Sequence, residues 1–237
     1  MGDDGLAVGA ALFEHNRTAG WALQPMIKDV YLGGDITSRH AEKALSGSGL
    51  REIAGGNDLE KEAARLLAEG KVIARASGRM EYGPRALGNR TIMYQPTDPS
   101  VNDWLNEKLR RTEFMPFAPV TLWEEKANCF KQINGAEETA RFMTITFECT
   151  PSMIDRCPAV CHVDQTARPQ LIREEDNPSY YRIVKTYQAL TGLPCVINTS
   201  FNMHEEPIVN TAEEAITAFK QSELDALILG DRLVERS

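Results

Sequence analysis

The stretch Glu81-Tyr-Gly-Pro-Arg-Ala-Leu-Gly-Asn-Arg90 combines two arginines, two glycines and a proline. It lies between two apolar runs, residues 72–76 and 91–94, which predict buried strands on both sides of it. Glycine lets a backbone approach a ligand closely, and the arginine fork fits the oxygens of phosphate or carboxylate. Arg79, Arg85 and Arg90 are therefore candidates for an anion-binding site between strands. A surface turn with solvated arginines is the alternative, because most arginines are exposed.

The composition of the chain limits the classes of partner that it can bind. It has 237 residues, 42% of them hydrophobic, and a net charge of -8. The negative charge disfavours a broad nucleic-acid surface, so a local basic site favours a small anionic ligand. No apolar run approaches the roughly 20 residues that span a bilayer, and residues 1–5 are acidic where a signal peptide is basic. We therefore expect a cytoplasmic protein without a membrane partner.

The five cysteines predict reduced thiols, as is usual in that compartment. Cys157, Cys161 and His162 have the spacing of half a zinc site, but no second pair with ligand spacing follows. Cys149 and Cys195 stand in apolar runs and are predicted to be small core residues.

Apolar periodicity and capping residues predict an alternation of helices and strands. The fold class is therefore α/β (α+β), with a mixed twisted sheet and flanking helices from about residue 56 onward. Residues 124–140 are polar and are predicted to form a mobile loop. The expected helices are 5–13, 38–46, 58–68, 99–111, 180–190 and 211–222, and the expected strands are 71–76, 91–94, 120–123, 141–148, 159–163, 170–173, 193–197, 225–229 and 232–235.

Two further groups of polar residues follow predicted elements. The strand 193–197 runs into Asn198-Thr-Ser-Phe-Asn202, which places hydrogen-bond donors at a sheet edge where α/β proteins bind ligands. These asparagines could instead hold a turn. Lys108, Arg110 and Arg111 crowd the end of a predicted helix, either to project toward an anion or because cations are favourable at a helix C-terminus.

Four blocks of sequence resemble the C-terminal region of the nodulation-type and antibiotic-pathway O-carbamoyltransferases. The resemblance covers roughly residues 70–235 and implies a YrdC-like fold for a domain of residues 56–237. Residues 2–12 resemble the end of the actin-like (ASKHA) domain of the same enzymes, so residues 1–55 are expected to be the remnant of that domain and a linker. The four blocks are 78–90, Pro116-Phe-Ala-Pro119, 162–170, and Asn198-Thr-Ser-Phe-Asn202 with Glu206-Pro207.

The resemblance implies a two-part reaction. The YrdC-like domain is expected to form carbamoyl-adenylate from carbamoyl phosphate and ATP, with Mg²⁺ accompanying the ATP. The ASKHA-type domain, the expected partner, then passes the carbamoyl group to an acceptor hydroxyl with Fe or another divalent metal. A nucleotide or carbamoyl-phosphate binding module, inactive without that domain, is the alternative. An RNA-contacting domain is disfavoured by the charge of -8.

The resemblance also implies residue roles. Lys108, Arg168 and Ser200 are the expected catalytic residues, and Asp3 corresponds to a metal-ligand aspartate whose histidine partners are absent from this sequence. Two positions depart from the family pattern. Met115 stands where an arginine is frequent, so the division of phosphate contacts among Lys108, Arg110 and Arg111 stays open, and Gln165 stands where glycine is frequent. The expected substrate- and nucleotide-binding residues are Arg79, Arg85, Arg90, Arg110, Arg111, Asn198 and Asn202.

Overall fold

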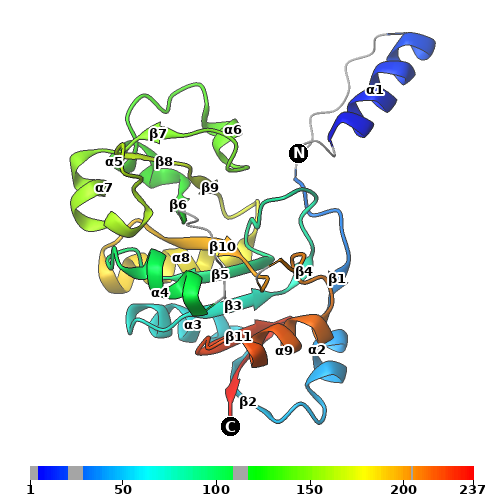
Figure 1. Ribbon diagram of the computed structural model, residues 1–237, viewed down its shortest axis with the longest axis vertical. Coiled ribbons are helices and arrows are strands. Elements are labelled where there is room, and N and C mark those ends of the chain that lie inside the picture. The colour runs from blue at the N-terminus through cyan, green and yellow to red at the C-terminus, as the bar shows by residue number, and fades with distance from the viewer. Residues whose placement is uncertain (1–4, 21–28, 109–116, 204) are drawn as a thin grey trace.

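The computed structural model describes residues 5–20, 29–108, 117–203 and 205–237. An eight-stranded sheet in the order β2-β12-β11-β3-β5-β10-β6-β9 runs through the molecule (Figure 1). The pairs β11–β3 and β6–β9 are parallel and the other pairs are antiparallel, which confirms the predicted mixed sheet. The strands are β2 (Leu50–Gly55), β3 (Ile73–Ala76), β5 (Arg90–Tyr94), β6 (Ala118–Leu122), β9 (Gln170–Ile172), β10 (Cys195–Ser200), β11 (Ala226–Leu229) and β12 (Arg232–Arg236).

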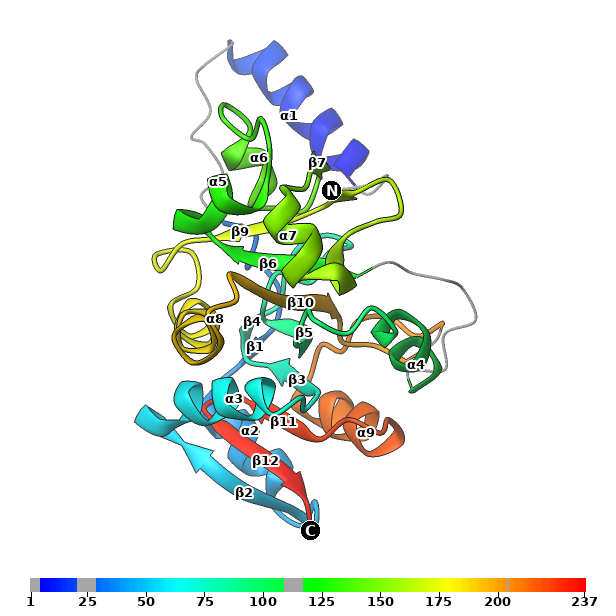
Figure 2. The same ribbon diagram turned by 90° about the vertical axis from the view of Figure 1, so that its left-hand side faces the viewer.

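Helices cover both faces of this sheet, so its central strands are buried throughout. Helices α3 (Leu59–Ala68) and α8 (Pro178–Thr191) pack side by side on one face. Helices α2 (Ser38–Leu45), α4 (Val101–Lys108) and α9 (Ala212–Gln221) cover the other face (Figure 2). The flanking helices confirm the predicted fold class.

Capping residues fix the ends of α2, α8 and α9. Thr37 begins α2 and Thr211 begins α9, each in a capping box. The side chain of Asn177 accepts a hydrogen bond from the backbone N–H of Tyr180 at the start of α8. Gly192 ends the same helix at a φ of 74°, where glycine carries no steric penalty.

Residues 123–168 form a lobe beyond β6 whose elements differ from those expected. The predicted loop 124–140 carries short helices, because its apolar residues, among them Cys129, Phe130 and Ile133, are buried in the core. Within the predicted strand 141–148 only the last two residues are extended, and a 3-10 helix replaces the predicted strand 159–163. The elements of the lobe are η2 (Trp123–Glu125), α5 (Lys126–Cys129), α6 (Glu137–Ala140), β7 (Phe147–Glu148), α7 (Pro151–Arg156), η3 (Pro158–Val160) and β8 (Thr166–Ala167).

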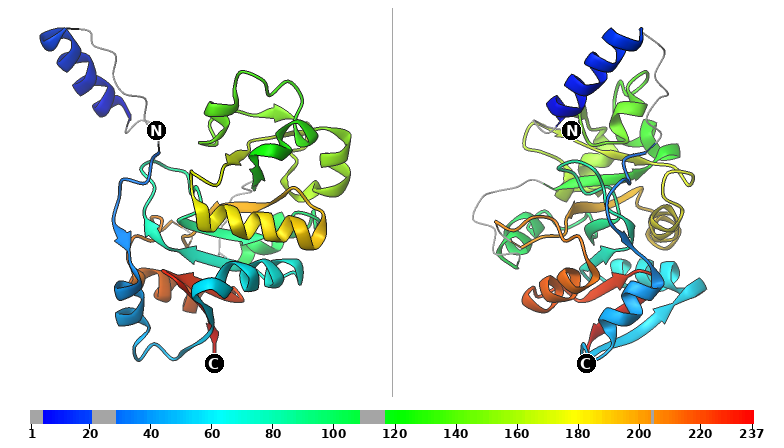
Figure 3. Two further views of the ribbon diagram at one scale, coloured as in Figure 1. Left: turned by 180° about the vertical axis from the view of Figure 1, so that it is seen from behind. Right: turned by 90° about the vertical axis from the view of Figure 1, so that its right-hand side faces the viewer.

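The N-terminal part of the chain lies outside the main sheet. Helix α1 (Gly5–Ala19) is longer than predicted and projects from the body (Figure 3). Strand β1 (Asp35–Ile36) pairs with β4 (Gly78–Arg79). Strand β2 precedes the domain boundary expected at residue 56, yet it pairs with β12 in the main sheet. Among the residues described, no helix is long and apolar enough to cross a membrane.

Candidate functional site

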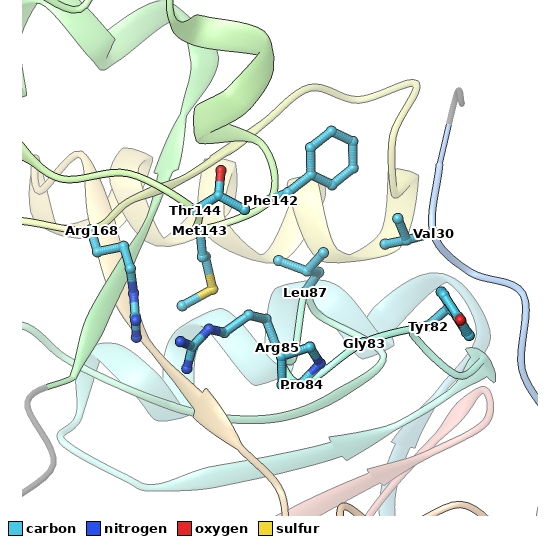
Figure 4. Close-up of a pocket in the computed structure, with 10 residues that line it drawn as sticks. All are labelled: Val30, Tyr82, Gly83, Pro84, Arg85, Leu87, Phe142, Met143, Thr144 and Arg168. Atoms are coloured by element: carbon cyan, nitrogen blue, oxygen red, sulfur yellow. The ribbon is translucent and has the colours of Figure 1, made fainter. Parts of the chain in front are cut away.

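A cavity of about 460 Å³ opens between the loop after β4 and residues 142–144 of the lobe (Figure 4). One part of its wall is apolar, and two arginine side chains enter from another part. Such a cavity suits a ligand with an apolar body and an anionic group. The lining residues are Val30, Tyr82, Gly83, Pro84, Arg85, Leu87, Phe142, Met143, Thr144 and Arg168.

Arg85 and Arg168 bring two positive charges into this cavity, and their guanidinium groups point toward one another (Figure 4). Within the described part of the chain, neither side chain has a hydrogen bond or an ion pair, and the Nε of Arg168 is buried without a partner. Burial lowers the pKa of Arg168, and the charge of Arg85 lowers it further. Two positive charges close together in a partly buried cavity repel one another, and a bound anion would offset this repulsion.

Glu81 holds the loop that carries Arg85. Its side chain is 6% exposed, and its Oε1 accepts hydrogen bonds from the backbone N–H groups of Leu87, Asn89 and Arg90 at 2.6, 2.8 and 3.3 Å. The carboxylate therefore satisfies buried backbone donors instead of pairing with an arginine side chain. This arrangement closes the loop around Arg85.

Close packing against helix α8 fixes the same loop from the other side. Gly88 has a φ of 117°, and a Cβ atom added there would lie 2.3 Å from the ring of Tyr180. The buried Arg75 donates to the carbonyl of Gly88 and, at 2.7 Å, to Oδ1 of Asn89. Only glycine meets both the backbone conformation and the lack of space at this position.

Asn198 contacts the cavity wall through its Nδ2, which lies 3.7 Å from the sulfur of Met143, and its amide is otherwise bonded to its own chain. Its Nδ2 donates to the carbonyl of Ala86 at 2.9 Å and to Oε1 of Gln170 at 2.8 Å, and its Oδ1 accepts from the hydroxyl of Thr91. Gln170 in turn donates to the carbonyl of Leu87 at 2.8 Å. We expected Asn198 to contact substrate. In the structure it is buried, and its hydrogen bonds join β10 to the loop that carries Arg85.

Ser200 lies two residues further along β10, on the same face of the strand as Asn198. It is half-buried, and its Oγ donates to Oδ1 of Asn202 at 2.6 Å. The Nδ2 of Asn202 donates to the carbonyls of Met203 and Glu206 at 2.9 and 3.2 Å. These two side chains shape the turn after β10, and neither lines the cavity.

Arg90 and Arg79 are placed as structural residues outside the cavity. Arg90 is fully buried, and its guanidinium donates to five backbone carbonyl groups, among them those of Gly34 and Asn210. Burial lowers the pKa of Arg90 to about 10. Arg79 is exposed and donates to the carbonyls of Leu32 and Gly33. Both arginines donate to backbone carbonyl oxygens of this chain. Of the three arginines expected at an anion-binding site, Arg85 alone lines the cavity, together with Arg168.

Lys108 is not brought together with this pair of arginines. Helix α4 packs on the sheet face that bears Ile92 and Tyr94, whereas Asn198 belongs to the opposite face. The Nζ of Lys108 donates to the carbonyl of Glu223 at 3.2 Å and lies 5.5 Å from the ring centroid of Trp104. The predicted residues Arg110 and Arg111 lie outside the described residues.

No metal site is found in the described part of the chain, where no three His, Cys, Asp or Glu side chains are grouped to hold an ion. Asp3, the expected metal ligand, lies outside this part. His162 of the possible half zinc site has its Nδ1 at 3.1 Å from the hydroxyl of Thr166. Burial lowers the pKa of His162.

The apolar wall of the cavity was missed by the sequence interpretation. Phe142 and Met143 were placed in a strand, although Met143 has a left-handed φ of 55° that a strand does not allow. Arg141 anchors this turn through ion pairs with Glu138 and Asp176 at 2.8 and 2.5 Å. Glu138 lies three residues from Arg141, but Asp176 lies 35 residues away, so no local pattern predicts the turn that this second ion pair fixes.

Comparison with known proteins assigns the family. The sequence model of the carbamoyltransferase C-terminus matches residues 64–236. The chain is 38% identical to an uncharacterised protein of Methanocaldococcus jannaschii, covering 100% of the chain and 39% of that protein. It is 36% identical to the nodulation protein NolNO of Sinorhizobium fredii, covering 99% of the chain and 35% of that protein. It therefore spans less than half the length of these relatives.

Solved structures share the fold. HypF in its phosphate- and nucleotide-bound form superimposes with a TM-score of 0.54 at 20% identity, covering 73% of this chain and 25% of HypF. The HypF of T. kodakarensis gives a TM-score of 0.51 at 18% identity, covering 79% of this chain and 22% of that one. Together with the sequence matches, these findings show that the chain belongs to the family of carbamoyltransferase C-terminal domains.

Proposed function

We propose that this chain is the part of a carbamoyltransferase that binds carbamoyl phosphate and ATP and forms carbamoyl-adenylate. Water hydrolyses carbamoyl phosphate to carbamate and phosphate, and a carbamate oxygen then attacks the α-phosphorus of ATP. The new bond is O–P, the leaving group is pyrophosphate, and Mg²⁺ accompanies the nucleotide. A partner domain of the ASKHA type then transfers the carbamoyl group to an acceptor hydroxyl.

The unpaired arginines of the cavity carry this proposal. Arg85 and Arg168 share one cavity without a carboxylate partner among the described residues. Carbamoyl phosphate and the phosphates of ATP repel one another, and fixed cations offset this repulsion and stabilise the charge that develops at phosphorus. The HypF structure of similar fold was obtained with phosphate and nucleotide bound, which supports the same ligand class here.

We assign the other residues by what they touch. The apolar wall at Leu87, Phe142 and Met143 offers a surface for an uncharged part of the ligand. Asn198 and Glu81 are positioning residues, because they hold the loop of Arg85 and contact no open space of the cavity. Ser200 is assigned to the adenylate phosphate only if its hydrogen bond to Asn202 exchanges for one to the ligand.

A binding module without turnover is the second candidate, and the position of Lys108 favours it. The expected catalytic lysine is bonded to Glu223 on the other face of the sheet. A domain that holds carbamoyl phosphate or nucleotide but lacks a reactive arrangement by itself would show binding without product. Binding and turnover are therefore measured separately.

The first measurement is titration calorimetry of the chain with ATP and with pyrophosphate. Replacing Arg85 or Arg168 by glutamine should weaken binding about 10- to 100-fold, since a charged hydrogen bond contributes roughly 1.5–3 kcal/mol. Arg51→Gln is the control, because Arg51 is an exposed arginine of β2 that pairs with Glu235. Equal affinities for all four proteins would contradict the proposed site.

The second measurement follows pyrophosphate after the chain is mixed with ATP, Mg²⁺ and carbamoyl phosphate. Release that requires carbamoyl phosphate and both arginines supports adenylate formation. Binding without release supports the module instead. The two candidate functions thus differ only in pyrophosphate release, whereas the titration tests the binding site that both require.

A further inference from the structure

All five cysteines of the chain gather in or beside the lobe of residues 123–168. Cys129 ends α5, Cys149 follows β7, Cys157 follows α7, Cys161 follows η3, and Cys195 begins β10. Cys161 is half-buried and the other four are fully buried. The sulfur atoms of Cys161 and Cys149 are 3.7 Å apart. Cys157 and Cys195 also share a side-chain hydrogen bond, but both of these cysteines are fully buried.

The backbone brings these two sulfurs together at one end of the β7–β8 ladder. The N–H of Cys149 donates to the carbonyl of Gln165 at 2.8 Å, and the N–H of His162 donates to the carbonyl of Thr166 at 2.7 Å. Both cysteines are therefore held by the same short pair of strands. A disulfide has an S–S length of about 2.05 Å, so from their separation of 3.7 Å the sulfurs must approach by about 1.7 Å.

The two thiols differ in reactivity. Cys149 is buried, and its hydrogen bond with Cys161 and its burial raise its pKa. The same hydrogen bond lowers the pKa of Cys161, which is the more exposed of the two. The thiolate is the nucleophile in thiol oxidation, so Cys161 is the sulfur that reacts first.

We propose that Cys149 and Cys161 form a reversible dithiol–disulfide pair that is oxidised by hydroperoxides. The thiolate of Cys161 attacks the peroxide oxygen, the O–O bond breaks, and Cys161 becomes a sulfenic acid while water or an alcohol leaves. The sulfur of Cys149 then attacks the sulfur of Cys161, the S–O bond breaks, and a second water leaves. Two thiols lose two electrons in total, and the peroxide gains them.

The disulfide would act on the strand that leads to the candidate site. Arg168 follows Ala167, the last residue of β8, and Ala167 pairs with Phe147 of β7. A bond between Cys149 and Cys161 closes one end of this ladder covalently, so the backbone N–H groups of residues 147–168 should exchange more slowly with solvent. An effect on ligand affinity rests on the proposed function, whereas the disulfide itself does not.

The test treats the folded full chain with hydrogen peroxide at low molar excess. The expected product has lost two hydrogen masses, yields a peptide in which Cys149 is linked to Cys161, and returns to the starting mass with dithiothreitol. Hydrogen exchange of residues 147–168, compared between the two forms, should show slower exchange in the oxidised one.

Four variants sharpen the test. Cys149→Ser should accumulate sulfenic acid on Cys161, detected with a cyclic dione, and Cys161→Ser should give neither product. Cys129→Ser is the control, since it removes a buried thiol and should leave the disulfide intact. Cys149→Ala repeats the first variant without a hydroxyl, and both proteins are checked for native circular dichroism. Oxidation that needs urea, or a link between Cys157 and Cys195 instead, would overturn the proposal.

Discussion

Gln165 has a left-handed backbone conformation, with φ 64°, in the turn before β8. The carbonyl of this residue accepts from Cys149, and its N–H donates to the carbonyl of His162 at 2.9 Å, so the turn is fixed on both sides. The left-handed region costs an L-residue about 1–2 kcal/mol, and glycine avoids that cost. The steric cost agrees with the glycine that the family resemblance implies at this position.

Gln165→Gly should therefore stabilise the chain. The relief of the left-handed conformation exceeds the entropy that glycine adds to the unfolded state, which leaves a gain of about 0.5–1 kcal/mol. Urea denaturation followed by circular dichroism measures the free energy of unfolding. Gln165→Ala serves as the control, because it removes the same side chain atoms beyond Cβ without relieving the backbone. A stability of Gln165→Gly equal to that of Gln165→Ala would contradict this account.

Glu81 should affect both stability and ligand binding. Glu81→Ala leaves three backbone N–H groups without their acceptor, which costs about 3 kcal/mol of unfolding free energy. Glu81→Gln keeps an acceptor oxygen and should lose about 1 kcal/mol. Because the loop carries Arg85, Glu81→Ala should also weaken the binding of pyrophosphate at a temperature where it is still folded. Unchanged affinity in a destabilised Glu81→Ala would mean that Arg85 does not depend on this carboxylate.

The sequence could predict the residue types of the candidate site better than their roles. From the sequence, Arg85 is expected in an anion-binding site and Arg168 among the catalytic residues, and both side chains enter the cavity. Arg90 and Asn198 were expected beside them, but they bind oxygens of their own chain. A guanidinium or amide group that fits a ligand fits a backbone carbonyl equally well. Only the folded structure shows whether a backbone carbonyl already occupies the position where a ligand oxygen could bind.

At the scale of elements, the conformation of the loop 82–89 depends on its close packing against α8. Gly88→Ala should destabilise the chain by about 3 kcal/mol or more, since the new methyl group enters the ring of Tyr180 and the φ of 117° is strained for alanine. The same change should weaken pyrophosphate binding, because the loop must shift. Thermal unfolding and calorimetry measure the two effects.

Gly47→Ala provides the matched control for this change. Gly47 also has a left-handed φ of 74°, but nothing lies within 4 Å of an added Cβ atom. It should lose only about 1 kcal/mol, through the backbone conformation alone, and should bind pyrophosphate as the unchanged chain does. Equal losses in the two variants would show that contact with Tyr180 is unimportant.

Elements with local signals were predictable, and those fixed by distant contacts were not. Helix α3 shows apolar residues on one face and α9 shows a capping box, so both were expected within a residue or two. Strand β2 was missed because its residues are half-buried at a sheet edge and show no clear alternation. The elements of the lobe of residues 123–168 were predicted wrongly for a similar reason. The ion pair between Arg141 and Asp176 joins residues far apart in the sequence, so local patterns do not reveal it.

For the whole molecule, the distribution of charge matters more than its sum. The chain carries a net charge of -8, yet its main cavity has two unpaired arginines within the described residues. A polyanion meets repulsion from the surface, whereas a small anion that enters the cavity meets mainly the local cations. The acidic surface thus favours the ligand class of the proposed function over nucleic acid.

The stability of the whole chain should fall when the solution becomes mildly acidic. Burial lowers the pKa of His162 below its ordinary value of 6.5. The charge of Asp164 opposes this shift and the charge of Arg168 adds to it, and the net effect is a lowered pKa. The unfolded chain therefore takes up a proton at His162 before the folded chain does. The stability from this residue is complete above pH 6.5 and is lost as the pH falls through the folded pKa.

Carboxylates add a second loss at lower pH. The pKa of Asp164 is lowered by hydrogen bonds from Thr166, and that of Glu138 by Arg141, so both stabilise the folded chain only while they are ionised. Chemical denaturation at a series of pH values from 8 down to about 2 would separate the two steps. His162→Gln should remove the first step and keep the second. His15→Gln, which changes an exposed residue of α1, should keep both, and a first step that survives His162→Gln would assign it to another group.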